Sequence, residues 1–191
     1  MDAFNYLAVM VSMVLSLGLT QLFAGIGNMV QVRRRVQPYW LHAMWIVLMI
    51  GLHIQMWWSF WMLRGVQEWT YTGFAFVLLG PAMLVIASHV LLPELVDGTI
   101  DVQKHYYDTR AVFFSLLAAA GAWALLLESM MGLNALIVPF RLVQIFGIGL
   151  MVLCAWSANR RVHAACTFIV IAMLVSTTLL TRYRLGQTGM E

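Results

Sequence analysis

Charged residues are scarce in this chain. Asp, Glu, Lys and Arg make up only 10% of its 191 residues, whereas soluble domains average about 25%. Hydrophobic residues make up 62%, and the mean hydropathy is +0.85. A soluble core of this size could not bury so much apolar surface, so we expect lipid to solvate much of the chain. The net charge of +3 gives no reason to expect a nucleic-acid partner.

Cysteines and catalytic motifs are also few. The two cysteines, Cys154 and Cys166, both fall in apolar segments, which argues against a disulfide framework. No Ser-His-Asp, HExxH or phosphate-loop pattern occurs, so we expect neither a conventional hydrolase nor an ATPase. We assign no catalytic residue and no metal ligand. Asp2 stands where a signal peptide would be basic, so we expect the first apolar segment to be retained.

Six apolar segments dominate the rest of the chain. Each can cross the ~30 Å hydrocarbon core of a bilayer as a helix, because a helix rises about 1.5 Å per residue. Helices are expected because lipid cannot satisfy backbone polar groups. The sequence therefore predicts one all-α domain over residues 1–191, a polytopic transmembrane bundle with short loops. The spans are expected at approximately 4–32, 39–63, 70–93, 110–131, 133–157 and 164–181.

Proline and turn residues refine the third span and the loop that follows it. Pro81, preceded by Gly80, lies at the centre of this span and predicts a kink, because proline removes a backbone hydrogen bond. In the loop, Asp97 and Gly98 predict a turn. Asp101 could cap a short helix that leads into the fourth span.

Basic residues in the loops predict the orientation, because Lys and Arg favour the cytoplasmic side of a membrane. Three alternate loops together hold seven of them, namely Arg33, Arg34, Arg35, Lys104, Arg110, Arg160 and Arg161. The opposite side holds Arg64, Arg182 and Arg184. We therefore expect a cell-membrane protein, of the bacterial inner membrane, with both termini on the non-cytoplasmic side.

Polar side chains near the centres of the spans are the candidate binding residues. Gln21, His53, Gln55 and Gln144 all fall within about two turns of their span centres. Polar groups in hydrocarbon are costly unless they meet one another or water. These residues predict a midplane polar layer, in which His53 could exchange a proton and the amides could coordinate a solute or water. The alternative is a buried hydrogen-bond network that locks the helix packing.

Depth alone does not fix which way these side chains face. His53 and Gln55 are about 200° apart around their helix, so both cannot face one centre without distortion. On the first span, Gly18, Gln21, Gly25 and Asn28 share one face. We interpret this face as a helix-packing seam, because small residues let a neighbouring backbone approach closely.

Arg141 is the one basic residue that falls well inside a span. An arginine within a membrane is costly unless it is paired or wet. The fourth and fifth spans are expected to form an antiparallel hairpin, which makes Glu128 the nearest candidate partner of Arg141. This pair could be a structural clamp or part of a binding site.

Three functions are compatible with these residues. The midplane layer favours a transporter or channel for a small solute or ion, with no cofactor. A membrane redox subunit that binds haem b or a quinone is an alternative, in which His42 and His89, at matched depth, would hold the haem. His105 and His163 lie near the same membrane face. The third possibility is a scaffold without a site of its own, in a homo-oligomer or with a membrane-protein partner.

Overall fold

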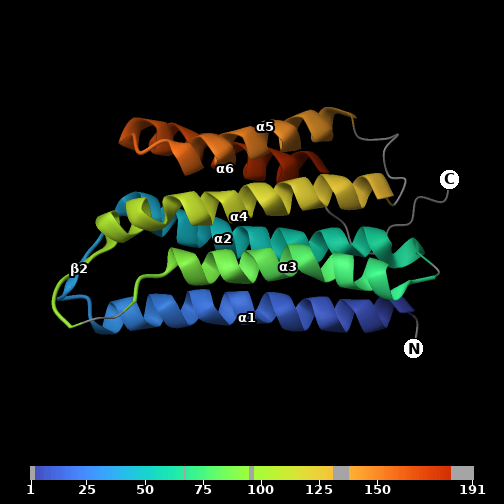
Figure 1. Cartoon of the computed structure of the whole chain (residues 1–191), viewed down its shortest axis with the longest axis horizontal. Coiled ribbons are helices and arrows are strands. Elements are labelled where there is room, and N and C mark those ends of the chain that lie inside the picture. The colour runs from blue at the N-terminus through green and yellow to red at the C-terminus, as the bar shows by residue number, and fades with distance from the viewer. Residues whose placement is uncertain (1–2, 67, 95–96, 131–137, 182–191) are drawn as a thin grey trace.

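The computed structural model describes residues 3–66, 68–94, 97–130 and 138–181, and it confirms the predicted all-α bundle. The described chain forms six α-helices that run back and forth along one axis (Figure 1). They are α1 (Ala3–Gln31), α2 (Trp40–Ser59), α3 (Tyr71–Leu91), α4 (Val102–Met130), α5 (Val138–Trp156) and α6 (Arg160–Thr181), with a short 3₁₀ helix, η1 (Phe60–Gly65), after α2. Five helices are long and apolar enough to cross a membrane, and α5 is apolar but shorter. This architecture is compatible with an integral membrane protein.

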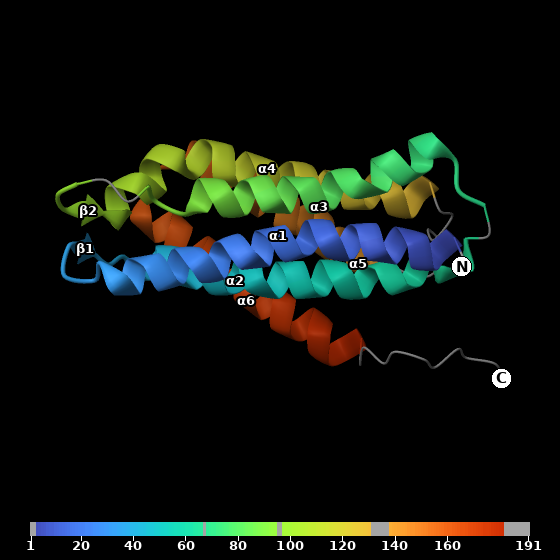
Figure 2. The ribbon, with the colours of Figure 1, turned by 90° about the horizontal axis from the view of Figure 1, so that it is seen from below.

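Each helix contacts the one that follows it in the chain, and further contacts join α1 to α3 and α2 to α6. Helices α1, α2 and α3 all contact one another, α3 packs against α4, and α4 packs against α5. Helix α6 contacts α2 and α5, and it diverges from α2 toward its C-terminal end (Figure 2). The close packing of α4 with α5 agrees with the hairpin expected from the sequence.

Large aromatic side chains fill the core between α2 and α4. Trp45 is completely buried, and its ring lies edge-on against Phe113 and Phe114, with ring centroids 5.6 and 4.9 Å away. Phe114 in turn contacts the Tyr106 ring two turns earlier on α4. These α4 residues share one face of the helix because they recur at intervals that approximate whole turns.

Helix α4 begins eight residues before the predicted start of the fourth span, at Val102 rather than at 110. The carboxylate of Asp101 accepts a hydrogen bond from the backbone N–H of Lys104, at 2.9 Å, as an N-terminal cap does. Gly98, in the predicted turn, has a φ of 104°, a backbone conformation that glycine adopts readily. Helix α3 continues through Pro81 as a single α-helix, and the kink stays a prediction.

A small parallel ladder joins two loops, which the sequence analysis does not anticipate. Strand β1 (Val36–Gln37) lies between α1 and α2, and β2 (Ile100–Asp101) lies between α3 and α4. The Ile100 N–H also donates to the Arg35 carbonyl, at 2.8 Å. Two residues per strand are too few to show a period in the sequence, so this ladder has no recognisable signal. It ties the α1–α2 turn to the α3–α4 loop.

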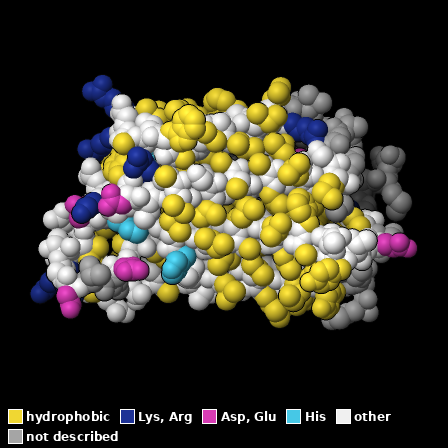
Figure 3. Space-filling model, in the orientation of Figure 1, with side chains coloured by type: hydrophobic (Ala, Val, Ile, Leu, Met, Phe, Trp, Pro, Cys, Tyr) yellow, Lys and Arg dark blue, Asp and Glu magenta, His cyan; other side chains and the backbone are white. Residues whose placement is uncertain are grey.

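Basic side chains gather at the end of the bundle where this ladder lies, which we call the basic end. Figure 3 shows Lys and Arg concentrated there, next to a wide apolar belt over the middle of the bundle. The basic end is defined by the seven residues of the predicted cytoplasmic loops, Arg33, Arg34, Arg35, Lys104, Arg110, Arg160 and Arg161. Its assignment to the cytoplasm stays a prediction.

Gly80→Ala is expected to destabilise the α3–α4 contact. A Cβ at Gly80 would overlap the six-membered ring of Trp123. That ring cannot easily move, because the Trp123 indole N–H donates to the Phe76 carbonyl at 2.7 Å. Overpacking of this kind costs about 1–3 kcal/mol, so thermal unfolding in detergent should begin several degrees lower.

Gly149→Ala is the matched control. Nothing lies within 4 Å of a Cβ at this position, and alanine favours the helix more than glycine does. The control should unfold at the wild-type temperature or slightly above it. Equal losses in the two variants would contradict the packing described for Gly80.

Candidate functional site

Histidine and tyrosine side chains form a dense cluster near the basic end. Its members come from α2, α4 and α6 and from the residue that precedes α2. We call it the histidine–tyrosine cluster, and it consists of Tyr39, His42, His105, Tyr106, Tyr107 and His163. Most of these side chains are buried, and the Tyr39 and Tyr107 hydroxyls are hydrogen bonded to each other at 2.9 Å.

His163 is the best-connected residue of this cluster. Its Nε2 lies 2.8 Å from the Ser157 carbonyl, and its Nδ1 lies 2.9 Å from the Tyr106 hydroxyl. A carbonyl can only accept, so Nε2 must carry the proton. In the neutral imidazole Nδ1 then accepts from the Tyr106 O–H. The turn after α5, the start of α6 and the start of α4 are held together by these two bonds.

His42 and His105 converge on the end of α3. The Nε2 atoms of these two imidazoles lie 2.8 and 3.1 Å from the Leu91 carbonyl. Leu91 is the last residue of α3, and carbonyls in the last turn of a helix have no partner within that helix. The two histidines therefore satisfy a carbonyl that would otherwise be buried without a donor. We interpret the histidine–tyrosine cluster as a structural lock, because its bonds are largely complete.

A second group of polar residues lies where α1 meets α2 and α3, and here the bonds are incomplete. We call Gly18, Gln21, His53 and His89 the α1–α3 seam. The side-chain amide Nε2 of Gln21 on α1 lies 2.8 Å from Nδ1 of His89 on α3. The other amide atom, Oε1 of Gln21, is buried and has no hydrogen-bond partner among the described residues.

His53 is the most deeply buried polar residue of the seam, with 1% of its surface exposed. Its Nδ1 lies 2.7 Å from the Met49 carbonyl one turn earlier on α2, so Nδ1 donates and Nε2 keeps a lone pair. Nε2 is buried and has no partner in the described part of the chain. It points at Gly18 of α1 so closely that a Cβ there would overlap the imidazole. Glycine is required at this position for α1 and α2 to approach each other.

The structure separates the four residues of the predicted midplane layer. Gln21 and His53 belong to the seam, whereas Gln144 of α5 donates to the Gly121 carbonyl of α4 at 3.4 Å. Gln55 is half-buried, and its side chain makes no hydrogen bond with the described residues. The layer therefore does not meet in one place, because helices at equal depth present their amides to different neighbours.

Arg141 lies on α5 beside the end of α4, as the predicted hairpin requires. Its guanidinium donates to the Ser129 hydroxyl, with the two atoms 3.0 Å apart. Glu128 is half-buried and lies within range of the charge on Arg141. A direct ion pair between Arg141 and Glu128 stays a prediction.

The two histidines of the haem alternative have different partners in this structure. His42 is engaged with the Leu91 carbonyl, and its ring lies 6.4 Å from the His105 ring. His89 is engaged with Gln21. These bonds occupy Nε2 of His42 and Nδ1 of His89, one nitrogen of each imidazole, and a histidine that ligates iron can keep a hydrogen bond on its other nitrogen. The haem alternative therefore stays a prediction.

Two hollows mark the surface of the bundle. One, of about 480 Å³, lies along α4 at Ala111, Val112, Ser115 and Leu116. The other, of about 390 Å³, lies at the end of α1, over residues 31–35. Neither of these two hollows is lined by a residue of the α1–α3 seam.

No protein-family model, curated protein or solved structure matches this chain. The assignment of a function therefore depends on the α1–α3 seam and the histidine–tyrosine cluster themselves.

Tyr106→Phe should destabilise the protein if the cluster is a lock. The change keeps the ring and its contacts but leaves Nδ1 of the buried His163 without a donor. A lost bond of this kind costs about 1–3 kcal/mol, which should lower the midpoint of thermal unfolding by several degrees. Tyr6→Phe is the control, because the Tyr6 side chain is 60% exposed at the other end of the bundle. An unchanged midpoint for Tyr106→Phe would contradict the proposed role.

Proposed function

We propose that this protein transports protons across a membrane along the α1–α3 seam, with His53 as the group that carries the proton at mid-depth. The observation that carries the proposal is the buried lone pair of His53 Nε2, which has no partner among the described residues. Histidine is the side chain best suited to gain and lose a proton near neutral pH.

Unsatisfied polar atoms in the middle of an apolar bundle need a reason. Each buried donor or acceptor without a partner costs about 1–3 kcal/mol, and few occur in native proteins. The seam holds two, Nε2 of His53 and Oε1 of Gln21, on helices that contact each other. Ionisable residues within spans commonly mark proton relays.

Further polar groups continue the seam toward both ends of the bundle. Toward the end opposite the basic end, the indole N–H of Trp57 donates to the Ser12 hydroxyl at 2.9 Å. Toward the basic end, Gln21 contacts His89, and His89 lies two residues before the Leu91 carbonyl that His42 and His105 bind. Ser12 and Gln21 are about 14 Å apart along α1, and His53 contacts Gly18 between them. Ser12 and Gln21 project from opposite sides of α1, since nine residues correspond to about 180° around a helix, so Gln21 and His53 are the polar groups nearest to Gly18 on the proposed pathway.

Close contact between α1 and α2 restricts what the seam can pass. The His53 imidazole lies directly against Gly18, so Nε2 becomes accessible only when the ring rotates or the two helices separate. A movement of this kind could admit water and release a proton. A large solute would require a far greater rearrangement, which is why we favour the proton over other small solutes.

His53→Leu should abolish most of the transport. The purified protein is placed in liposomes that contain a pH-sensitive dye, and a potassium diffusion potential supplies the driving force. The pH of the lumen should change faster in these liposomes than in protein-free liposomes. Leucine fills a similar volume but cannot bind a proton, so we expect the initial rate to fall about tenfold or more. Gln144→Leu is the control, because Gln144 is also a polar residue at mid-depth but lies between α4 and α5.

Two results would count against the proposal. Equal proton flux for wild type and His53→Leu would remove His53 from the pathway. A wild-type rate no higher than that of empty liposomes would favour the scaffold alternative. The histidine–tyrosine cluster, whose hydrogen bonds are largely complete, would then be the main structural feature in support of a scaffold. A visible absorption spectrum of the purified protein tests the haem alternative, because bound haem would give a Soret band.

A further inference from the structure

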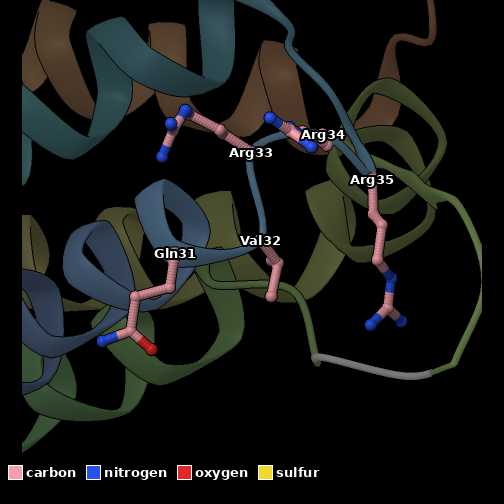
Figure 4. Close-up of a pocket in the computed structure, with 5 residues that line it drawn as sticks. All are labelled: Gln31, Val32, Arg33, Arg34 and Arg35. Atoms are coloured by element: carbon pink, nitrogen blue, oxygen red, sulfur yellow. The ribbon is translucent and has the colours of Figure 1, made fainter.

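The turn after α1 carries two arginines, Arg33 and Arg34, that form no ion pair with the described carboxylates. A hollow of about 390 Å³ opens to the surface at this turn and is lined by Gln31, Val32, Arg33, Arg34 and Arg35 (Figure 4). We infer that this hollow binds the phosphate-bearing headgroup of an anionic phospholipid through Arg33 and Arg34. The inference is independent of the proposed proton pathway.

The three arginines of the turn differ in their partners. Arg35 is committed to the α3–α4 loop, because its Nε donates to the Gly98 carbonyl at 2.9 Å and its guanidinium lies 3.8 Å from the Asp97 carboxylate. Arg33 makes one long hydrogen bond, 3.4 Å, to the Val30 carbonyl. The Arg34 side chain makes no hydrogen bond or ion pair with the described residues. Figure 4 shows Arg35 pointing away from Arg33 and Arg34.

Backbone hydrogen bonds fix the turn that presents these two side chains. The N–H groups of Val32, Arg33 and Arg35 donate to carbonyls three or four residues earlier, at 3.2, 3.3 and 2.8 Å. The β1–β2 ladder begins at the next residue, Val36. Arg33 and Arg34 therefore project from a rigid support, and guanidinium groups held in this way can bind a phosphate with paired hydrogen bonds.

The position of the hollow along the bundle matches the depth of lipid headgroups. The apolar helix α1 ends at Gln31, where the hollow begins. Trp40, at the start of α2, is 40% exposed and is of the residue type that favours the membrane interface. Arg160 lies over the Tyr39 ring, 5.9 Å from its centroid, which brings a further cation to the start of α2.

Charge at this end of the bundle favours an anionic headgroup over a zwitterionic one. The basic end contains seven cations, whereas the adjoining loop and helix start contain four carboxylates, those of Glu94, Asp97, Asp101 and Asp108. One of the four is already paired with Arg35. A basic cluster at the end of an apolar helix attracts anionic lipids.

The inference can be tested by native mass spectrometry of the full chain in detergent. We expect phosphatidylglycerol to bind at least about tenfold more tightly than phosphatidylcholine. The double variant Arg33→Gln/Arg34→Gln should lose most of this preference. The control Lys104→Gln/Arg161→Gln removes the same charge from exposed positions of the basic end outside the hollow. This control should keep the preference for phosphatidylglycerol. Thermal unfolding of both double variants checks that each is folded.

Three outcomes would overturn the inference. The first is an equal affinity of the wild type for the two lipids. The second is an equal loss of the preference for phosphatidylglycerol in the two double variants. This result would indicate a general attraction of anionic lipid to the basic end rather than a site at the hollow. The third is displacement of the bound lipid by inorganic phosphate at low concentration, which would indicate a site for free phosphate.

Discussion

Polar groups inside this bundle require partners within the protein to avoid a cost in free energy, because neither lipid nor an apolar core offers one. The histidine–tyrosine cluster meets this requirement. His42 and His105 supply donors to the Leu91 carbonyl, and Tyr106 supplies one to His163. The α1–α3 seam does not meet it, since His53 Nε2 and Gln21 Oε1 remain without partners among the described residues. This contrast distinguishes a lock from a candidate pathway better than residue type does, because histidines occur in both.

The position of each polar residue along its helix could be predicted from the sequence, but the direction of its side chain could not. Gln21, His53 and Gln144 fall near the centres of their spans, as expected, yet Gln144 faces α4 and Gln21 faces α3. Facing depends on how each helix is rotated against its neighbours, and apolar residues surround these helices too evenly to set a rotation. Gly18 was the best available signal, since a small residue on α1 marks the place where another helix comes close.

The elements at the basic end show the same division. Asp101 as a helix cap and Gly98 as a turn residue follow from local chemistry, and both predictions are confirmed. The start of α4 at Val102 agrees with the helix expected after Asp101, whereas the β1–β2 ladder depends on contacts between distant parts of the chain. The convergence of His42 and His105 also depends on such contacts. A helix leaves the carbonyls of its last turn without partners in the helix, so donors are expected near the end of α3, but this rule does not say which residues supply them.

The ladder between β1 and β2 has a mechanical consequence. It fastens the α1–α2 turn to the α3–α4 loop at one end of the bundle, while at the other end α6 already diverges from α2 (Figure 2). Any movement that parts α1 from α2 must then pivot about the fastened end. On the proposed pathway, His53 would then be uncovered first toward the end opposite the arginines, so the two ends of the bundle would not have equal access to it.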